Sequence, residues 1–162
     1  QEVGAAMSWW EQFLRALGLR PTVERPSPSD IVMETGILGD NYAAKVIIDL
    51  RQLNIPFTRQ PRIWIPPIPD TNSMDGAFDI GNNNILICGA DPTNQTIMLD
   101  FMKVGDIAVY RTPTAYIIHR IIEIGTDGEG RYFIFKGDNN SGEDHGRIRD
   151  SQVEWLSIGI IY

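Results

Sequence analysis

The residues of this sequence that could do chemistry are a serine, a histidine and two aspartates, each beside residues typical of a turn or a strand end. They are Ser73, His119, Asp138 and Asp144. A serine hydroxyl is a weak nucleophile, so it needs a general base, and the base needs a partner that orients it. The four residues supply candidates for all three roles. The chain has only two histidines, and His145 lies in a polar loop, so we favour His119 as the base.

The surroundings of His119 allow two interpretations. Residues 116–122 form an apolar run typical of a β-strand, and strand alternation places Ile117, His119 and Ile121 on one face. A lone histidine among isoleucines is commonly a hydrogen-bonded core residue. Burial also favours a neutral imidazole, which is the form that can take a proton from a serine. With a candidate nucleophile present, we favour the general base.

Four short motifs, in this order, resemble the signal peptidase family of serine proteases. The similarity is greatest to the archaeal, endoplasmic-reticulum and sporulation branch, in which histidine replaces the bacterial catalytic lysine. The motifs are Ser-Met-Asp-Gly at 73–76, Gly-Asp-Ile-Ala-Val-Tyr at 105–110, Ile-Ile-His-Arg-Ile-Ile at 117–122 and Lys-Gly-Asp-Asn-Asn at 136–140, followed by Asp144. Gly76 stands where the family usually has proline, which loosens the turn after the serine.

The resemblance implies hydrolysis of a peptide bond through an acyl-enzyme. Ser73 would be the nucleophile and His119 the base, with Asp138 or Asp144 supporting the imidazole. The family has an aspartate at both positions, and the sequence does not rank them. Backbone N–H groups near the serine would hold the oxyanion. The expected partner is a protein or peptide substrate, and no cofactor or metal is expected.

Oxygen side chains in the last motif also allow a metal-binding interpretation. Asp138, Asn140 and Asp144, with Gly142 between them, loosely resemble a calcium-binding loop. The spacing is imperfect, and the flanking segments are β-rich rather than helical. We therefore keep calcium as an alternative to the catalytic interpretation.

Two further alternatives differ in function. A related self-cleaving repressor fold shares the Ser-Met motif, but it uses a lysine base and cuts an Ala-Gly bond. This sequence has His119 in place of that lysine and contains no Ala-Gly dipeptide. The other alternative is a non-catalytic descendant that binds peptides or serves as an assembly module, which Gly76 in the nucleophile motif favours.

The composition limits the partners of the chain. A formal net charge of −7 at pH 7 argues against a nucleic-acid partner and against electrostatic docking on anionic lipid. No stretch approaches the roughly twenty apolar residues that a membrane-spanning helix needs. We therefore expect a soluble relative of the family, without a signal peptide or transmembrane segment, and the sequence leaves its location open. The single cysteine, Cys88, lies in an apolar run typical of a buried thiol.

Residues 1–58 are predicted to form a small helical appendage. An apolar face that includes Trp9 and Trp10 indicates a helix from Ser8 to about Gly18, and residues 21–29 form a proline-rich linker. A second helix is predicted from Asp40 or Asn41 to Pro56. The aromatic face of the first helix could make peripheral contact with a membrane, but we favour packing on its own domain or a partner chain.

Residues 59–162 are predicted to form a mainly β, signal-peptidase-like domain, an antiparallel sheet or barrel. Short apolar runs are separated by turns, without regularly intervening helices. Asp127-Gly128 between two of these runs is a hairpin signal. The predicted strands are residues 63–65, 85–88, 107–110, 116–124, 132–135 and 155–161.

Overall fold

The computed structural model describes residues 53–161, so most of the predicted helical appendage lies outside the described residues. Only the end of its second helix can be compared with the structure. Asn54 has a positive φ of 56°, and residues 54–57 are not helical. No helix therefore covers residues 54–56, where the sequence predicted the end of the second helix.

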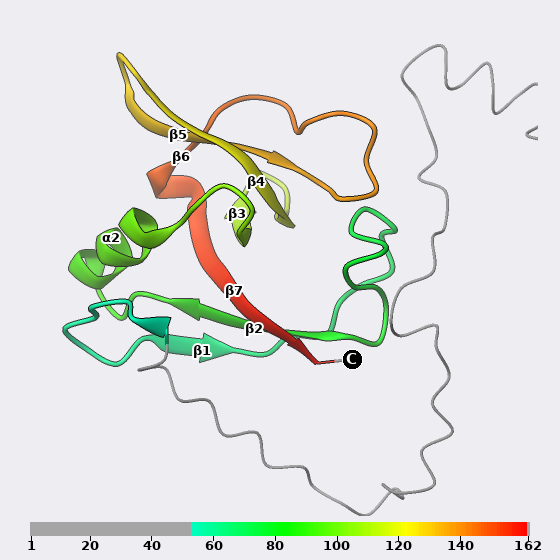
Figure 1. The fold of residues 1–162 in the computed structure, drawn as a ribbon, viewed down its shortest axis with the longest axis horizontal. Coiled ribbons are helices and arrows are strands. Elements are labelled where there is room, and N and C mark those ends of the chain that lie inside the picture. Colours follow the sequence, from blue (N-terminus) through cyan, green and yellow to red (C-terminus); the bar gives the residue numbers. More distant parts are fainter. Residues whose placement is uncertain (1–52, 162) are drawn as a thin grey trace, which may run out of the picture.

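The described residues form a seven-stranded sheet in which every neighbouring pair is antiparallel. The spatial order is β1-β2-β7-β3-β4-β5-β6. Figure 1 shows β7 running across the molecule from the neighbourhood of β6 to β2 and β1. The strands are β1 (Arg62–Trp64), β2 (Asn83–Cys88), β3 (Ile107–Arg111), β4 (Tyr116–Asp127), β5 (Gly130–Lys136), β6 (Ile148–Arg149) and β7 (Val153–Ile161).

The mainly β prediction is confirmed, and each predicted strand is present with shifted ends. The hairpin signal is also confirmed, because Asp127 pairs with Gly130 where β4 turns into β5. The short strand β6 was not predicted. Its two residues are too few to show a recognisable sequence pattern. The strand forms because these residues pair with Tyr132 and Phe133 of β5.

The structure contains a helix that the sequence analysis missed, α2 (Pro92–Phe101). Asp91 caps it by accepting a hydrogen bond from the backbone N–H of Asn94 at 2.9 Å, and Pro92 occupies the first turn. The apolar periodicity is weak because only Asn94, Met98 and Leu99 of the helix are buried. At ten residues α2 is too short to cross a bilayer, and no other helix within residues 53–161 could do so.

The sheet has apolar clusters on both faces. The main core lies on one face, and a small cluster of Ile68, Met74 and Phe78 packs against Ile107, Ile118 and Ile160 on the other. The buried residues of the main core are Ile87, Cys88, Met98, Leu99, Met102, Ala108, Tyr110, Ile121, Phe133, Phe135, Ile148, Val153 and Leu156. Strand alternation along β4 thus directs alternate side chains to the two clusters.

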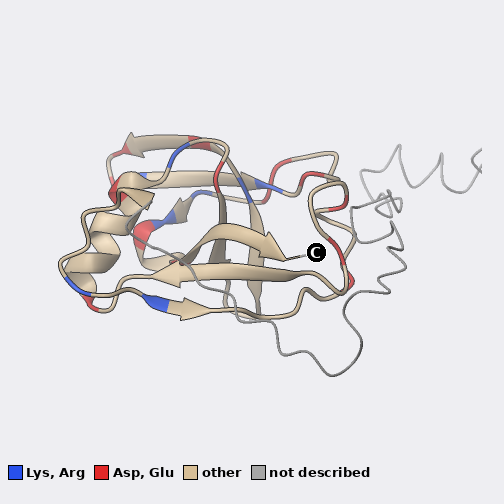
Figure 2. Ribbon diagram, turned by 60° about the horizontal axis from the view of Figure 1, so that its bottom comes forward, with Lys and Arg blue, Asp and Glu red and all other residues tan. Residues whose placement is uncertain are grey.

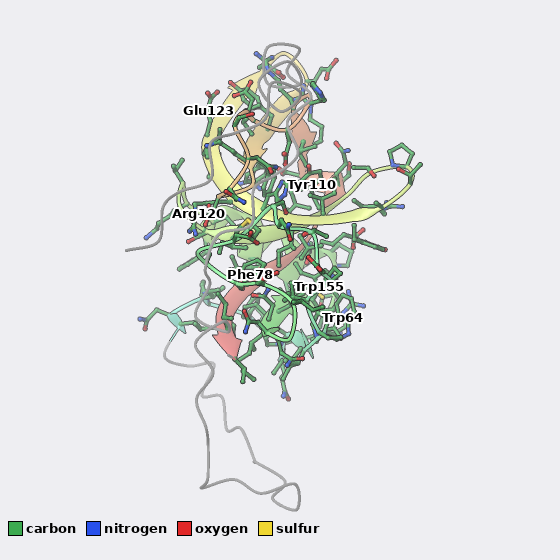
Figure 3. All side chains as sticks on the ribbon, turned by 90° about the vertical axis from the view of Figure 1, so that its right-hand side faces the viewer. Trp64, Phe78, Tyr110, Arg120, Glu123 and Trp155 are labelled. Atoms are coloured by element: carbon green, nitrogen blue, oxygen red, sulfur yellow. The ribbon has the colours of Figure 1, made fainter. Side chains whose placement is uncertain are left out.

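The edge strand β1 is held against the sheet partly by aromatic contacts. The rings of Trp64 and Trp155 lie near one another in Figure 3, with centroids 5.7 Å apart. The Arg62 guanidinium lies 5.7 Å from the Trp155 ring centroid. These contacts join β1 to β7 across the intervening strand β2, although the three residues of β1 are themselves exposed.

The proposed boundary after residue 58 remains a prediction that can be tested with fragments. Leu53, Ile55 and Phe57 pack against the main core, and Thr58 N–H donates to Asn94 Oδ1 at 2.8 Å. We expect a 53–162 fragment to melt at a higher temperature than a 59–162 fragment. Each partly buried apolar side chain contributes on the order of 1 kcal/mol to the free energy of unfolding. Equal melting temperatures by circular dichroism would contradict a contribution from residues 53–58.

Candidate active site

Two loops far apart in sequence lie side by side at one end of the sheet. We call residues 71–79 the serine turn and residues 137–147, between β5 and β6, the carboxylate loop. In Figure 1 they are the green coil and the orange loop on the right, and Figure 2 shows acidic residues, in red, in this region. Asn139 joins them: its backbone N–H donates to Ser73 O at 2.9 Å and its side-chain Nδ2 to Asn72 O at 2.9 Å.

Gly137 permits this close approach. It is buried, and a Cβ at this position would lie 2.6 Å from Ser73 O and 2.7 Å from Asn140 Nδ2. Real Cβ atoms do not approach a backbone oxygen so closely, so a side chain would push the two loops apart. The glycine of the Lys-Gly-Asp-Asn-Asn motif therefore has a steric role at the contact with the serine.

The serine turn is held by two buried side chains next to Ser73, and two of its residues have positive φ. Met74 and Phe78 are buried in the small cluster, whereas Ser73 is half-buried. Asn72 has φ 54° and Gly76 has φ 88°. Proline is restricted to φ near −65°, so it could not adopt the conformation of Gly76. Gly76 thus occupies a turn conformation that proline would not permit.

His119 is buried and bonded to Asp144. Its ring Nδ1 lies 2.6 Å from Asp144 Oδ2, and the side chain belongs to a residue with only 7% of its surface exposed. An ionised carboxylate can only accept, so Nδ1 carries the proton and donates it to Asp144. This tautomer leaves the lone pair of Nε2 as the position that could accept a proton from a hydroxyl.

A third group, the hydroxyl of Tyr110, bonds the same carboxylate. It donates to Asp144 Oδ2 at 2.7 Å. Burial acts to raise the pKa of Asp144, but the hydrogen bonds from His119 and Tyr110 outweigh it, so this pKa lies below its ordinary value. Burial, followed by the bond to Asp144, raises the pKa of Tyr110, and the phenol stays protonated as a donor. Asp144 is therefore an ionised acceptor held by two donors.

Asp138 has a different partner. Its two carboxylate oxygens accept from Arg120, Oδ1 from Nε at 2.8 Å and Oδ2 from Nη2 at 2.6 Å. Arg120 is adjacent to His119 on β4 and so points to the opposite face, and Figure 3 shows Arg120 apart from Tyr110. Arg120 Nη1 also donates to Gly105 O at 2.7 Å. Asp138 thus fixes the start of the carboxylate loop to β4.

A calcium site would need both aspartates to face one point, and the structure does not bring them together. Asp138 bonds Arg120 and Asp144 bonds His119, so the carboxylates diverge to opposite faces of β4. Within residues 53–161, no group of three or more His, Cys, Asp or Glu side chains could hold a metal ion. His145 is exposed, as its polar loop suggested.

The nucleophile and base candidates are not hydrogen-bonded to each other. Ser73 Oγ lies 3.3 Å from Thr71 Oγ1, and within residues 53–161 no hydrogen bond connects it to the His119 ring. The structure brings His119 and Asp144 into contact and places Ser73 against the loop that carries Asp144. Catalytic hydrogen bonds are often long or absent before substrate binds.

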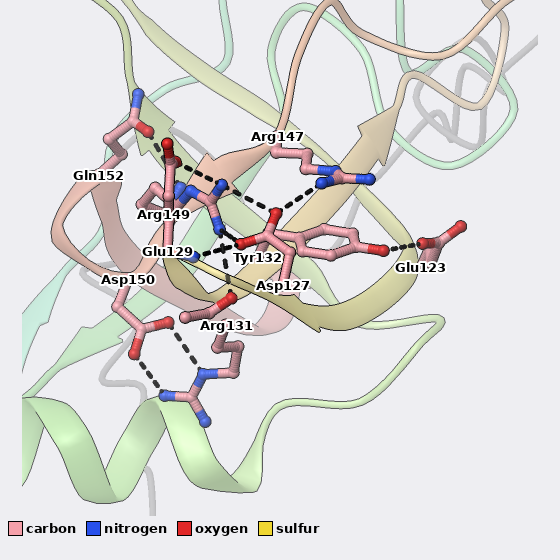
Figure 4. Close-up of polar contacts among 10 residues, drawn as sticks. Glu123, Asp127, Glu129, Arg131, Tyr132, Arg147, Arg149, Asp150 and Gln152 are labelled. Carbon is pink, nitrogen blue, oxygen red and sulfur yellow. Dashed lines mark hydrogen bonds and ion pairs between the residues drawn. The ribbon is translucent and has the colours of Figure 1, made fainter.

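An ionic network fixes the far end of the carboxylate loop (Figure 4). Asp127, at the end of β4, accepts from Arg149 at 2.9 and 3.0 Å and also from Arg147. The hydrogen bond from Arg149, with that of the Glu129 backbone, holds the pKa of Asp127 well below its ordinary value. The loop is therefore tied to β4 at both ends, by Asp138 with Arg120 and by Asp127 with the two arginines.

Sequence reasoning missed Tyr110, Asn139 and Gly137 as parts of this site. For Tyr110, a signal was present. If 107–110 and 117–120 are paired as a hairpin, Ala108 opposes His119 and Tyr110 opposes Ile117, which places Tyr110 on the His119 face. Asn139 and Gly137 act through contacts with the serine turn, which local sequence pattern does not predict.

Comparisons of the chain with models of protein families, with curated proteins and with solved structures found no match. The resemblance to signal peptidases therefore rests on the four motifs and their order. What the structure adds is the geometry: a buried histidine bonded to a partly buried aspartate on a mainly β sheet, with a serine turn packed on the loop that carries the aspartate.

Replacing Gly137 by alanine tests the contact between the two loops. The new Cβ would collide with Ser73 O, so we expect the variant to lose about 1–3 kcal/mol in the free energy of unfolding, the usual cost of overpacking. Gly142 in the same loop is the matched control, because a Cβ there meets no atom within 4 Å. Chemical denaturation should separate the two variants. Equal losses would show that the contact does not constrain the loops.

Proposed function

We propose that this protein is a serine endopeptidase with a signal-peptidase-like fold, in which Ser73 is the nucleophile, His119 the general base and Asp144 its supporting carboxylate. The observation that carries the proposal is the 2.6 Å contact between Nδ1 of the buried His119 and Oδ2 of the partly buried Asp144. Asn139, in the same loop as Asp144, holds the backbone of Ser73. Asp138 is then a structural partner of Arg120.

The proposed reaction begins with a movement of the serine turn, because Met74 packs on the face of the sheet opposite to His119. The Ser73 hydroxyl leaves Thr71 and reaches His119, and Oγ attacks the substrate carbonyl while Nε2 takes the proton. Nε2 then returns the proton to the leaving amine, and water hydrolyses the acyl-enzyme by the same route. Asp144 stabilises the imidazolium in both steps. The lowered pKa of Asp144 supports this role, because the carboxylate stays ionised at neutral pH.

The second candidate function is a non-catalytic module that binds peptides or assembles with a partner. The observation that favours it is the contact of Ser73 Oγ with Thr71, 3.3 Å away, in place of a bond to His119. In such a module the His119–Asp144 pair would be a satisfied polar pair of the core. A self-cleaving repressor-like peptidase is a weaker candidate, because this chain has neither the lysine base nor the cleavage dipeptide of that fold.

A fluorophosphonate serine probe distinguishes the enzyme from the module. We expect the wild type to be labelled and Ser73→Ala to lose the label, while Ser141→Ala, in the exposed part of the carboxylate loop, keeps it. His119→Ala should lower the labelling rate by about a thousandfold or more, because the hydroxyl loses its base. His145→Ala should not change it. Absence of labelling in the wild type would favour the module.

Replacing each aspartate by asparagine tests which carboxylate supports the imidazole. We expect Asp144→Asn to lower turnover by about ten thousandfold through loss of tautomer control and of the charge partner. Asp138→Asn should weaken the fold through Arg120 but keep most of the turnover. The opposite order, measured by peptide hydrolysis, would assign the supporting role to Asp138.

The same Asp144→Asn variant makes a signed prediction about pH. Since the pKa of Asp144 is lower in the folded than in the unfolded chain, its ionised form stabilises the fold above the unfolded value of about 4. That contribution is lost as the pH falls through the folded pKa. The difference in melting temperature between wild type and variant should therefore be largest above pH 5 and shrink at lower pH.

A further inference from the structure

We propose that Tyr110 is a positioning residue, which holds the Asp144 carboxylate and through it fixes the orientation and tautomer of His119. The inference deepens the proposed function and rests on it. Tyr110 ends the motif at 105–110 but was given no role there, and its role follows from two hydrogen bonds that meet on one oxygen. Tyr110 O–H donates to Asp144 Oδ2 at 2.7 Å, and His119 Nδ1 lies 2.6 Å from the same atom.

The tyrosine ring is rigidly placed. Tyr110 is 2% exposed and lies in β3, which pairs with β4 through Ala108 and His119. Its ring packs on Phe135 of β5, with centroids 4.7 Å apart and an angle of 34° between the planes. Because β3 and β5 both pair with β4, which carries His119, the hydroxyl has a fixed position relative to the imidazole.

The chemistry of the tyrosine makes it a donor that does not compete with the base. Burial and the adjacent carboxylate raise the pKa of the Tyr110 phenol, so it stays protonated. The phenol therefore carries no charge and cannot act as a second base beside His119. Asp144 lies in a loop, and its backbone N–H donates to Phe135 O at 2.8 Å. The backbone bond fixes the loop, and the Tyr110 hydroxyl then fixes the rotation of the carboxylate.

Without that hydroxyl, Asp144 would have one side-chain donor instead of two. The groups that influence its charge are His119, Tyr110 and the neighbouring His145. Removing the Tyr110 bond removes one of the interactions that lower the pKa of Asp144. The carboxylate also becomes free to rotate, so Nδ1–H of His119 no longer has a fixed acceptor.

Tyr110→Phe in the full chain tests this inference, since it removes the hydroxyl and keeps the ring on Phe135. Tyr132→Phe is the matched control. Its hydroxyl also donates to a carboxylate, Glu123 Oε1, at 2.7 Å, but on the exposed side of the β4–β5 hairpin (Figure 4). Two NMR signals are read without substrate: the carboxyl carbon of Asp144 during a pH titration, and the ring nitrogens of His119.

We expect the titration midpoint of Asp144 to rise in Tyr110→Phe and to stay at the wild-type value in Tyr132→Phe. The neutral His119 ring should be a single Nδ1–H tautomer in the wild type and in Tyr132→Phe, and a mixture in Tyr110→Phe. Peptide turnover should fall roughly tenfold in Tyr110→Phe, the effect of one hydrogen bond to a charged group.

Either NMR signal remaining at its wild-type position in Tyr110→Phe would overturn the proposal, as would wild-type turnover in an active enzyme. Both signals changing as expected supports it. Failure of the proposed function is seen separately, as a wild type that does not react with the serine probe. In that case the Asp144 and His119 signals still decide whether Tyr110 holds the pair.

Discussion

The partly buried carboxylate of Asp144 imposes the main physical constraint on this structure. A charge withdrawn from water is tolerated only when hydrogen bonds replace its hydration. Asp144 meets this requirement with the His119 ring at 2.6 Å and the Tyr110 hydroxyl at 2.7 Å. The donors come from β4 and β3, and the acceptor comes from a loop. The carboxylate loop must therefore cross the end of the sheet at one position, and that position brings Asn139 to the serine turn.

Strand alternation on β4 divides the polar residues of the site between two faces. His119 lies on the face of the main core, and Arg120 lies on the face that carries the small cluster with Met74. The loop after β5 serves both faces, with Asp138 bonded to Arg120 and Asp144 bonded to His119. The adjacent His-Arg pair and the two spaced aspartates of the sequence motifs thus correspond to two separate contacts, a hydrogen bond between His119 and Asp144 and an ion pair between Arg120 and Asp138.

Much of the sheet could be predicted from the sequence because apolar runs and the Asp127-Gly128 turn depend on local chemistry. The face that His119 occupies followed from alternation in the same way. α2 was missed because its signals are the Asp91 cap and Pro92, while its apolar pattern is weak. Which of Asp138 and Asp144 contacts His119 could not be predicted, since it depends on the path of a loop. The proximity of Ser73 to Asn139 likewise depends on long-range packing.

Both anchors of the carboxylate loop lie on one strand. Arg120, near the beginning of β4, holds Asp138, and Asp127, at the end of β4, holds Arg147 and Arg149. Both ends of the loop are thus held by the same strand, and only a short segment has to be closed between them. The entropic cost of closing a loop grows with its length, so this cost is small here. The distance between the two anchors is set by the rise of one strand. The shape of the carboxylate loop thus depends on β4 and not on how β1 and β2 are arranged at the far edge of the sheet.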